Sequence, residues 1–177
     1  SPTSPEVDGV VFISDLGYSD QSFGRAVGSV YLSGQAARAR VAVLDSALVI
    51  TAAMVLSQGA PFTVSGVARR ADLSALLALA AAERPGVGGM ISGSLEARGR
   101  LGDPDSLEIA AHLSAAEVHT PRARMALAQP VNLTVGRGAL AMEDILFAGS
   151  GGRFSLRGSA VQGGRVTMHL VLENTSL

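Results

Sequence analysis

Apolar side chains occupy every second position along several short segments of this chain. In the clearest case, the segment 94–101 (S-L-E-A-R-G-R-L), the odd-numbered residues are apolar or glycine and the even-numbered residues are polar. Side chains of a strand alternate between two faces, so this pattern predicts a sheet with one apolar and one polar face. The same alternation recurs at 107–113, 131–135, 154–158 and 166–172.

Strands are predicted along nearly the whole chain, with turn sequences rich in glycine between them. The segment 47–56 is apolar on both faces, so its periodicity fits a strand or a helix, and its valines and isoleucine favour a strand. Consecutive strands joined by short turns indicate an antiparallel meander. The other expected strands are 7–13, 26–34, 39–44, 61–68, 94–101, 106–114, 117–120, 123–128, 131–136, 138–143, 145–149, 153–161 and 165–173.

One helix is predicted, near residues 72–84. Asp72 has the chemistry of an N-cap, and Pro85-Gly86 ends the segment. Leucines recur between these limits at helical spacing, at Leu73, Leu76 and Leu77. We interpret this helix as a cap that packs its leucines on the sheet.

Glycines that we expect to end strands indicate an internal repeat. Gly34, Gly66 and Gly99 are separated by 32 and 33 residues, and Gly158 follows after 59, close to two periods. Such self-similarity favours an elongated sheet built by repetition over a closed sandwich. The opening residues S-P-T-S-P-E are typical of a linker, so we expect a linker at residues 1–6. The repeat predicts a single elongated β-repeat segment over residues 7–177, with a helical insertion at about 71–85.

The composition excludes several kinds of function. The 177 residues are 47% hydrophobic but only 4% aromatic, and the formal net charge is −1, so no nucleic-acid partner is predicted. All 14 basic residues are arginine, which we attribute to codon bias rather than to phosphate recognition. Without lysine or cysteine, the chain has no Walker A lysine, Schiff base, disulfide or thiolate. No apolar run reaches the roughly 18 residues of a membrane-spanning helix.

Candidate catalytic residues all have a simpler interpretation, so no enzyme activity, cofactor or metal site is predicted. We interpret His112, His119 and His169 as surface histidines, because none has a partner at metal-ligand spacing. Ser150 lies in a glycine-rich turn without the surroundings of a nucleophile elbow. Asp103 flanks a proline in a turn sequence, G-D-P-D.

The segment 92–104 (S-G-S-L-E-A-R-G-R-L-G-D-P), followed by S-L-E-I-A-A-H-L-S, resembles the repeat of TamB-like proteins of the AsmA superfamily. The segment 130–160 is similar to that family's next unit, in which two strands precede a G-x-x-x-L-x-L-x-G element. The resemblance is good over about 86–172 and weaker over 7–70.

The resemblance implies a mainly β fold: an elongated antiparallel meander sheet curled into an open half-barrel with an apolar inner face, plus the one short helix. It also implies a fragment of a protein anchored in the inner membrane and spanning the periplasm of Gram-negative bacteria. The expected function is a hydrophobic groove that shields and conducts phospholipid acyl chains and supports outer-membrane biogenesis, with an outer-membrane barrel protein of the TamA type as a further partner. The residues expected to line the groove are Leu95, Ala97, Leu101, Leu107, Ile109, Leu113, Val131, Leu133, Ile145, Phe147, Phe154, Leu156, Val166, Met168 and Leu170.

The residues leave a second hypothesis open. Many of the apolar side chains are alanine, so the sheet could pack shut and act as a structural or protein-binding scaffold. Its edge strands would then receive a strand of an outer-membrane protein by β-augmentation.

Overall fold

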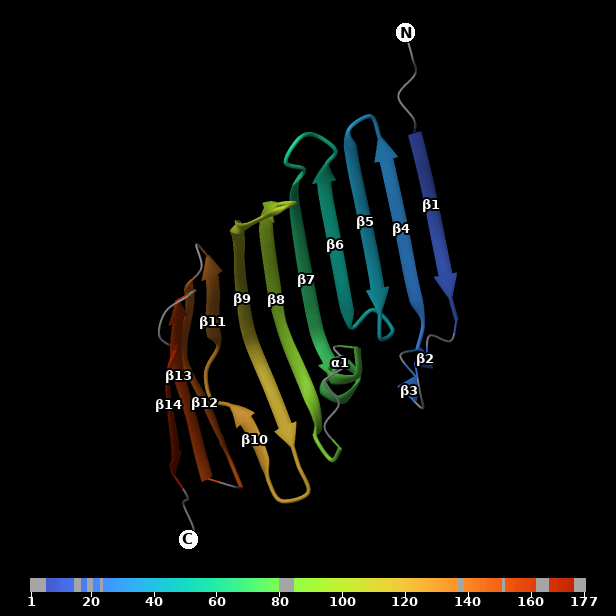
Figure 1. Ribbon diagram of the computed structural model, residues 1–177. Helices are drawn as coiled ribbons and strands as arrows, with labels where there is room; N and C mark the ends of the chain where they lie inside the picture. The colour runs from blue at the N-terminus through green and yellow to red at the C-terminus, as the bar shows by residue number, and fades with distance from the viewer. Residues whose placement is uncertain are drawn as a thin grey trace.

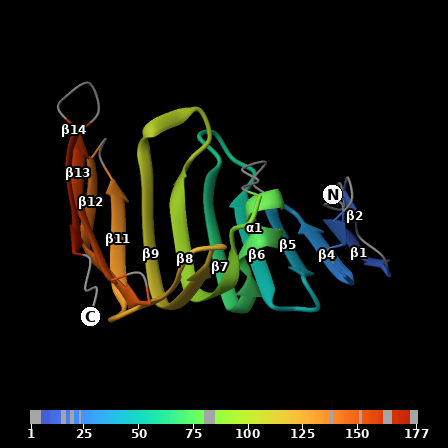
Figure 2. The same cartoon turned by 90° about the horizontal axis from the view of Figure 1, so that it is seen from below.

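The chain folds as one extended, twisted β-sheet with a single short helix on one side (Figures 1 and 2). The computed structural model describes residues 6–14, 17–18, 21–22, 24–79, 85–136, 139–150, 152–161 and 166–173. The expected linker at 1–6 lies outside this part except for Glu6, which begins the first strand.

The main sheet has twelve strands, and a hairpin of two short strands lies apart from it. The hairpin consists of β2 (Gly17–Tyr18) and β3 (Gln21–Ser22). The strands of the main sheet are β1 (Glu6–Ile13), β4 (Ala26–Ser33), β5 (Ala36–Val43), β6 (Leu48–Val55), β7 (Pro61–Asp72), β8 (Gly88–Arg100), β9 (Asp103–His119), β10 (Arg124–Leu127), β11 (Val131–Gly136), β12 (Ala139–Gly149), β13 (Gly152–Val161) and β14 (Val166–Glu173).

The strands follow one another across the sheet in chain order, and each pairs antiparallel with its neighbours. β10 and β11 share one position, because both pair with β9 on one side and with β12 on the other. The prediction of a mainly β chain with one antiparallel meander and one short helix is confirmed.

Several strands are longer than the local pattern predicts. The ambiguous segment 47–56 is strand β6, and the segments 106–114 and 117–120 belong to the single strand β9. The segments 138–143 and 145–149 likewise form the single strand β12, whose register shifts between Met142 and Ile145. A β-bulge inserts an extra residue into a strand, so it interrupts the alternation without ending the strand.

The helix α1 (Leu73–Leu79) begins where the sequence predicts. The Asp72 carboxylate accepts hydrogen bonds from the backbone N–H groups of Ser74 (2.8 Å) and Ala75 (3.1 Å), as an N-cap does. The buried face of α1 consists of Ala75 and Ala78, which pack against Leu44, whereas its described leucines are only half-buried. The expectation that the leucines pack on the sheet stays a prediction, and the most deeply buried side chains described on α1 are the two alanines.

Among the residues that the structure describes, no second layer covers the sheet. The accessible surface is 12,060 Å², whereas a compact monomer of 18.0 kDa exposes about 8,000 Å². Over the described residues, seven hydrophobic side chains are buried, and five of them are alanine. The chain thus exposes much of the apolar surface that a sandwich would bury.

Candidate functional site

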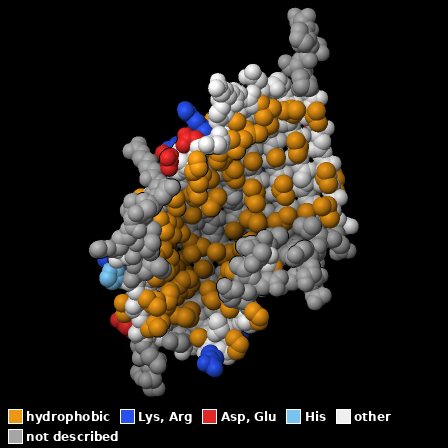
Figure 3. Space-filling model, viewed as in Figure 1, with side chains coloured by type: hydrophobic (Ala, Val, Ile, Leu, Met, Phe, Trp, Pro, Cys, Tyr) orange, Lys and Arg blue, Asp and Glu red, His pale blue; other side chains and the backbone are white. Residues whose placement is uncertain are grey.

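One face of the sheet is apolar from its first strand to its last. In an antiparallel sheet, residues paired across strands lie on the same face, so the register assigns each side chain to a face. Figure 3 shows hydrophobic side chains spread over this face, with charged groups only near its margins. One row across the sheet is Val11, Gly28, Val41, Ile50, Gly66, Leu95, Ala111, Leu133, Met142, Gly158 and Met168.

Most residues predicted to line a groove share this apolar face. The register places the following on it: Leu95, Ala97, Leu107, Ile109, Leu113, Val131, Leu133, Ile145, Phe147, Phe154, Leu156 and Leu170. The side chains of Val166 and Met168 lie outside the described part of the structure.

Two of the predicted residues fit a lining poorly. Leu101 lies in the turn between β8 and β9, where its side chain is 57% exposed, because β8 ends at Arg100. Val131 is on the apolar face, but its exposed fraction is 0%. Neither residue offers the half-exposed strand surface that a bound chain would contact.

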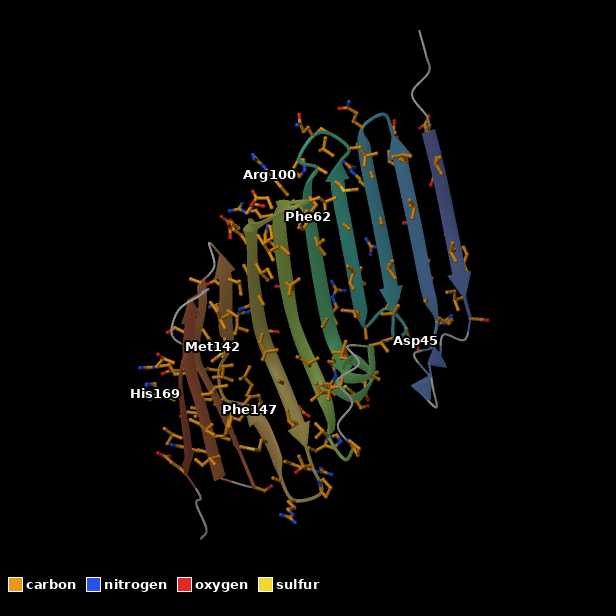
Figure 4. All side chains as sticks on the ribbon, viewed as in Figure 1. Asp45, Phe62, Arg100, Met142, Phe147 and His169 are labelled. Carbon is orange, nitrogen blue, oxygen red and sulfur yellow. The ribbon has the colours of Figure 1, made fainter. Side chains whose placement is uncertain are left out.

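Two phenylalanines pack together on the apolar face, one on β12 and one on β13. Phe147 and Phe154 are paired across these strands, with ring centroids 6.3 Å apart and an interplanar angle of 56°. This tilted arrangement suits the quadrupoles of the two rings. Phe147 is labelled in Figure 4.

Glycines on this face create room for larger neighbours instead of ending strands. Gly66 and Gly158 lie inside β7 and β13, and Gly99 is the penultimate residue of β8, so our expectation that these glycines end strands is wrong. Of the four repeat glycines, Gly34 alone lies in a turn, with φ 57°. A Cβ at Gly99 would lie 3.2 Å from two ring carbons of Phe62. Gly99 thus marks a cross-strand packing position.

The helix covers one end of the apolar face. α1 adjoins β7 and β8 (Figures 1 and 2). Ala71 on β7 and Ala116 on β9, which lie on the apolar face near the helix, are both buried. The Ser74 hydroxyl is the main cause that lowers the pKa of Asp72, and partial burial opposes it. The backbone N–H groups of Ala75 and Ser74 and the charge of His119 lower this pKa further.

The opposite face is polar and carries paired charges. Arg98 on β8 forms a salt bridge of 2.6 Å with Glu108 on β9. The β12 bulge directs both of its carboxylates to this face, because Asp144 pairs with Arg157 on β13 while Glu143 accepts from Asn132 on β11. The hydrogen bond from Arg157 is the main cause that lowers the pKa of Asp144 and raises that of Arg157.

A hydrogen-bonded chain of side chains crosses three strands of the polar face. The Asn132 backbone N–H and its side-chain amide both donate to one Glu143 oxygen, each at 3.0 Å. The Asn132 side-chain oxygen lies 2.8 Å from Nδ1 of His112. The interpretation of His112, His119 and His169 as surface residues is confirmed, since all three are exposed. These hydrogen bonds could not be predicted from the sequence, because the residues that they join are 11 to 20 positions apart.

The polar face is also hollowed, which the sequence analysis missed. A groove of about 860 Å³ runs over β6 to β12, and Ala53, Ala110 and Ala141 are among the small side chains that line it. Thr51, Thr63, Ser65 and Thr134 line it too, as do the charged residues Glu96, Arg98 and Glu108.

The chain matches no family model, no curated protein and no solved structure. The resemblance to TamB-like proteins therefore stays a prediction. Within the described ranges, no helix is long and apolar enough to cross a membrane. The same ranges hold no group of three or more His, Cys, Asp or Glu residues placed to bind a metal ion.

Proposed function

We propose that this chain is a non-enzymatic section of a hydrophobic groove that shields and conducts phospholipid acyl chains across the periplasm. The parent protein would be anchored in the inner membrane, work with a barrel protein of the TamA type, and support outer-membrane biogenesis. In this proposal the sheet is one stretch of an open half-barrel, and its apolar face is the inner, lipid-facing surface.

The observation that carries the proposal is the uninterrupted apolar row from β1 to β14. Every residue along the row is apolar or glycine, and no charged residue interrupts the row. An exposed apolar patch of this extent is uncommon on a soluble monomer and marks an interaction surface. Eleven strand positions about 4.8 Å apart span roughly 48 Å, longer than one phospholipid.

The energetics favour a mobile acyl chain. Each CH₂ group moved from water to an apolar surface gains about 0.8 kcal/mol, so a shielded chain is held by many small contributions. The lining side chains are mainly alanine, valine, leucine and isoleucine, so this energy changes little along the row. Acyl chains could therefore slide without meeting a polar barrier.

Ile109 and Ala110 provide a matched test, because they are neighbours on β9 and face opposite sides. Lipid that co-purifies with the protein would be counted by native mass spectrometry and identified after extraction. Ile109→Arg should reduce lipid occupancy at least tenfold, since it places a charge among acyl chains. Ala110→Arg adds the same charge to the polar face and should leave occupancy unchanged.

A second pair repeats the test on another strand. Leu133 and Thr134 are adjacent on β11 and also face opposite sides. Leu133→Arg should reduce occupancy and Thr134→Arg should not, with circular dichroism confirming that both variants fold. Wild-type lipid stoichiometry in Ile109→Arg and Leu133→Arg would overturn the groove.

The sheet edges support one alternative function. β1 and β14 end the strand order, so each has an outer edge with no partner strand among the described residues. Phe12 on β1 and Leu172 on β14 are 75% and 71% exposed. As a scaffold, the chain would bind strands of outer-membrane proteins at these edges by main-chain hydrogen bonds. A lipid-free protein that binds unfolded strand peptides, and loses them on Val11→Pro in β1, would favour this function over the groove.

A further inference from the structure

Two arginines on the polar face line a small pocket, and neither forms a salt bridge with a residue that the structure describes. Arg40 on β5 and Arg69 on β7 both line a cavity of about 220 Å³. Within the part of the chain that the structure describes, carboxylates pair with other arginines, namely Arg25, Arg98 and Arg157. The remaining lining residues are Ser46, Val49, Thr51, Ser65 and Val67.

The register explains why these residues meet. β6 lies between β5 and β7, and Arg40 is opposite Thr51, which in turn is opposite Ser65. Val49 and Val67 form the next row of the same face. The backbone N–H of Arg69 donates to the carbonyl oxygen of Ala47 at 2.8 Å, which holds β7 beside the start of β6. The two arginines therefore flank a floor of hydroxyl and valine side chains.

The β5–β6 turn brings a third hydroxyl group to the pocket. Leu44, Asp45 and Ser46 have φ angles of 53°, 53° and 71°, a left-handed conformation that costs energy in residues other than glycine. The Ala47 N–H closes the turn on the Leu44 carbonyl oxygen at 2.9 Å, and Leu44 packs against the helix. Asp45, labelled in Figure 4, accepts from Arg25 at 3.3 Å. These contacts hold the strained turn in place and position Ser46 at the pocket.

Two guanidinium groups with three hydroxyl groups are the chemistry of phosphate recognition. Guanidinium groups form bidentate, charge-assisted hydrogen bonds with phosphate oxygens, and hydroxyl groups can donate to the oxygens that remain. The cavity is roughly seven times the volume of ~30 Å³ that a water molecule occupies in the liquid, enough for a phosphate group and part of its substituent. We propose that this pocket binds the phosphate group of a phosphate monoester. The site lies on the polar face, so it is independent of the lipid groove that we propose on the apolar face.

Two carboxylates lie near this site, where a negative charge would weaken phosphate binding. Asp45 adjoins Ser46 and is paired with Arg25, so its charge is offset. Glu96 on β8 lies opposite Ser65, one strand beyond the pocket, and it has no salt bridge with any residue described. Removing the charge of Glu96 should therefore strengthen phosphate binding.

NMR titration of the chain with glycerol 3-phosphate at constant ionic strength tests the proposal. The Nε–H signals of Arg40 and Arg69 and the amides of Ser46, Thr51 and Ser65 should shift and saturate. Arg40→Gln and Arg69→Gln should each weaken binding about tenfold, since each removes charge-assisted hydrogen bonds. Glu96→Gln should bind more tightly.

Arg38→Gln is the matched control, because Arg38 lies two residues from Arg40 on the same face but does not line the pocket. It removes the same charge and should leave the affinity unchanged. An equal loss in Arg38→Gln and Arg40→Gln, or shifts that follow ionic strength alone, would overturn the site.

Two further probes identify the source of the phosphate. Inorganic phosphate tests whether the group suffices without its substituent. Vesicles of phosphatidate in phosphatidylcholine, compared with pure phosphatidylcholine vesicles, test whether a lipid headgroup enters the pocket. Co-sedimentation that requires both phosphatidate and Arg40 would assign the site to lipid headgroups, and saturable shifts with the soluble phosphates alone would assign it to free metabolites. Binding of none of the three phosphate probes would contradict the proposal.

Discussion

Gly99 on β8 lies directly against the ring of Phe62 on β7, close enough that a methyl group would lie 3.2 Å from two ring carbons. The two residues are paired across the strands on the apolar face (Phe62 is labelled in Figure 4). The same methyl group would lie 3.4 Å from the Cα atom of Leu107 on β9. The glycine thus provides the space that the ring occupies.

Gly99→Ala should destabilise the sheet by about 1 kcal/mol, since overpacking forces the ring and the neighbouring strand to shift. Chemical denaturation measures the effect. Gly9→Ala is the control, because a Cβ at Gly9 on β1 meets nothing within 4 Å. That substitution should be neutral or stabilise by up to about 1 kcal/mol, since it restricts the unfolded chain. Equal losses in the two variants would contradict the packing described.

The Asp72 cap predicts a pH-dependent stability. Asp72→Ala should cost about 1 kcal/mol at neutral pH, since two backbone N–H groups lose their acceptor. The folded-state pKa of Asp72 is lowered from 3.8, so the cap's charge-dependent stabilisation is present above that value and is lost as the pH falls through the folded pKa. The stability difference between the wild type and Asp72→Ala should therefore shrink as the pH falls below 3.8, toward the smaller difference that a neutral acceptor gives. Asp72→Asn keeps an acceptor at every pH, and its difference from Asp72→Ala should stay constant over the same range.

The ion pair at the β12 bulge predicts a shifted titration. Arg157 is the group that lowers the pKa of Asp144, so Arg157→Gln should raise that pKa toward its ordinary value of 3.8. NMR titration of the Asp144 carboxyl carbon measures the change. Concentrated salt should have a similar effect on the wild type, because the pair is solvent-exposed. Arg98→Gln, which breaks the separate pair with Glu108, should leave the Asp144 titration unchanged.

The hydrogen bonds that link Glu143, Asn132 and His112 predict which nitrogen of His112 carries the proton. The side-chain NH₂ group of Asn132 donates to Glu143, so the side-chain oxygen of Asn132 faces His112. This oxygen can only accept a hydrogen bond, so it accepts from the Nδ1–H of His112. Nitrogen NMR of the neutral imidazole should therefore show the Nδ1–H tautomer. Asn132→Ala removes the acceptor and should lower the Nδ1–H population. An Nε2–H tautomer in the wild type would mean that the amide of Asn132 is turned the other way.

Much of the fold could be predicted from the sequence because strand alternation is local. The period of two along 94–101 assigns Leu95 and Ala97 to one face whatever strand lies beside them. The same holds for the cap of α1, where Asp72 bonds to groups two and three residues away. Where the pattern broke at Met142, however, the sequence suggested two strands, because a bulge resembles a turn when its partner strand is unknown.

The sequence by itself determined the β class, the two faces and the start of the helix, since each depends on neighbours a few residues apart. Only the tertiary structure decided which residues face one another across strands. Gly99 meets Phe62, Asn132 meets Glu143, and Arg40 shares a pocket with Arg69 because of the register and the turns. These pairings are non-local, and the backbone hydrogen bonds that form them are the same for every residue type. An alternating sequence therefore carries little information about its partners, and the apolar row and the arginine pocket become visible only in the assembled sheet.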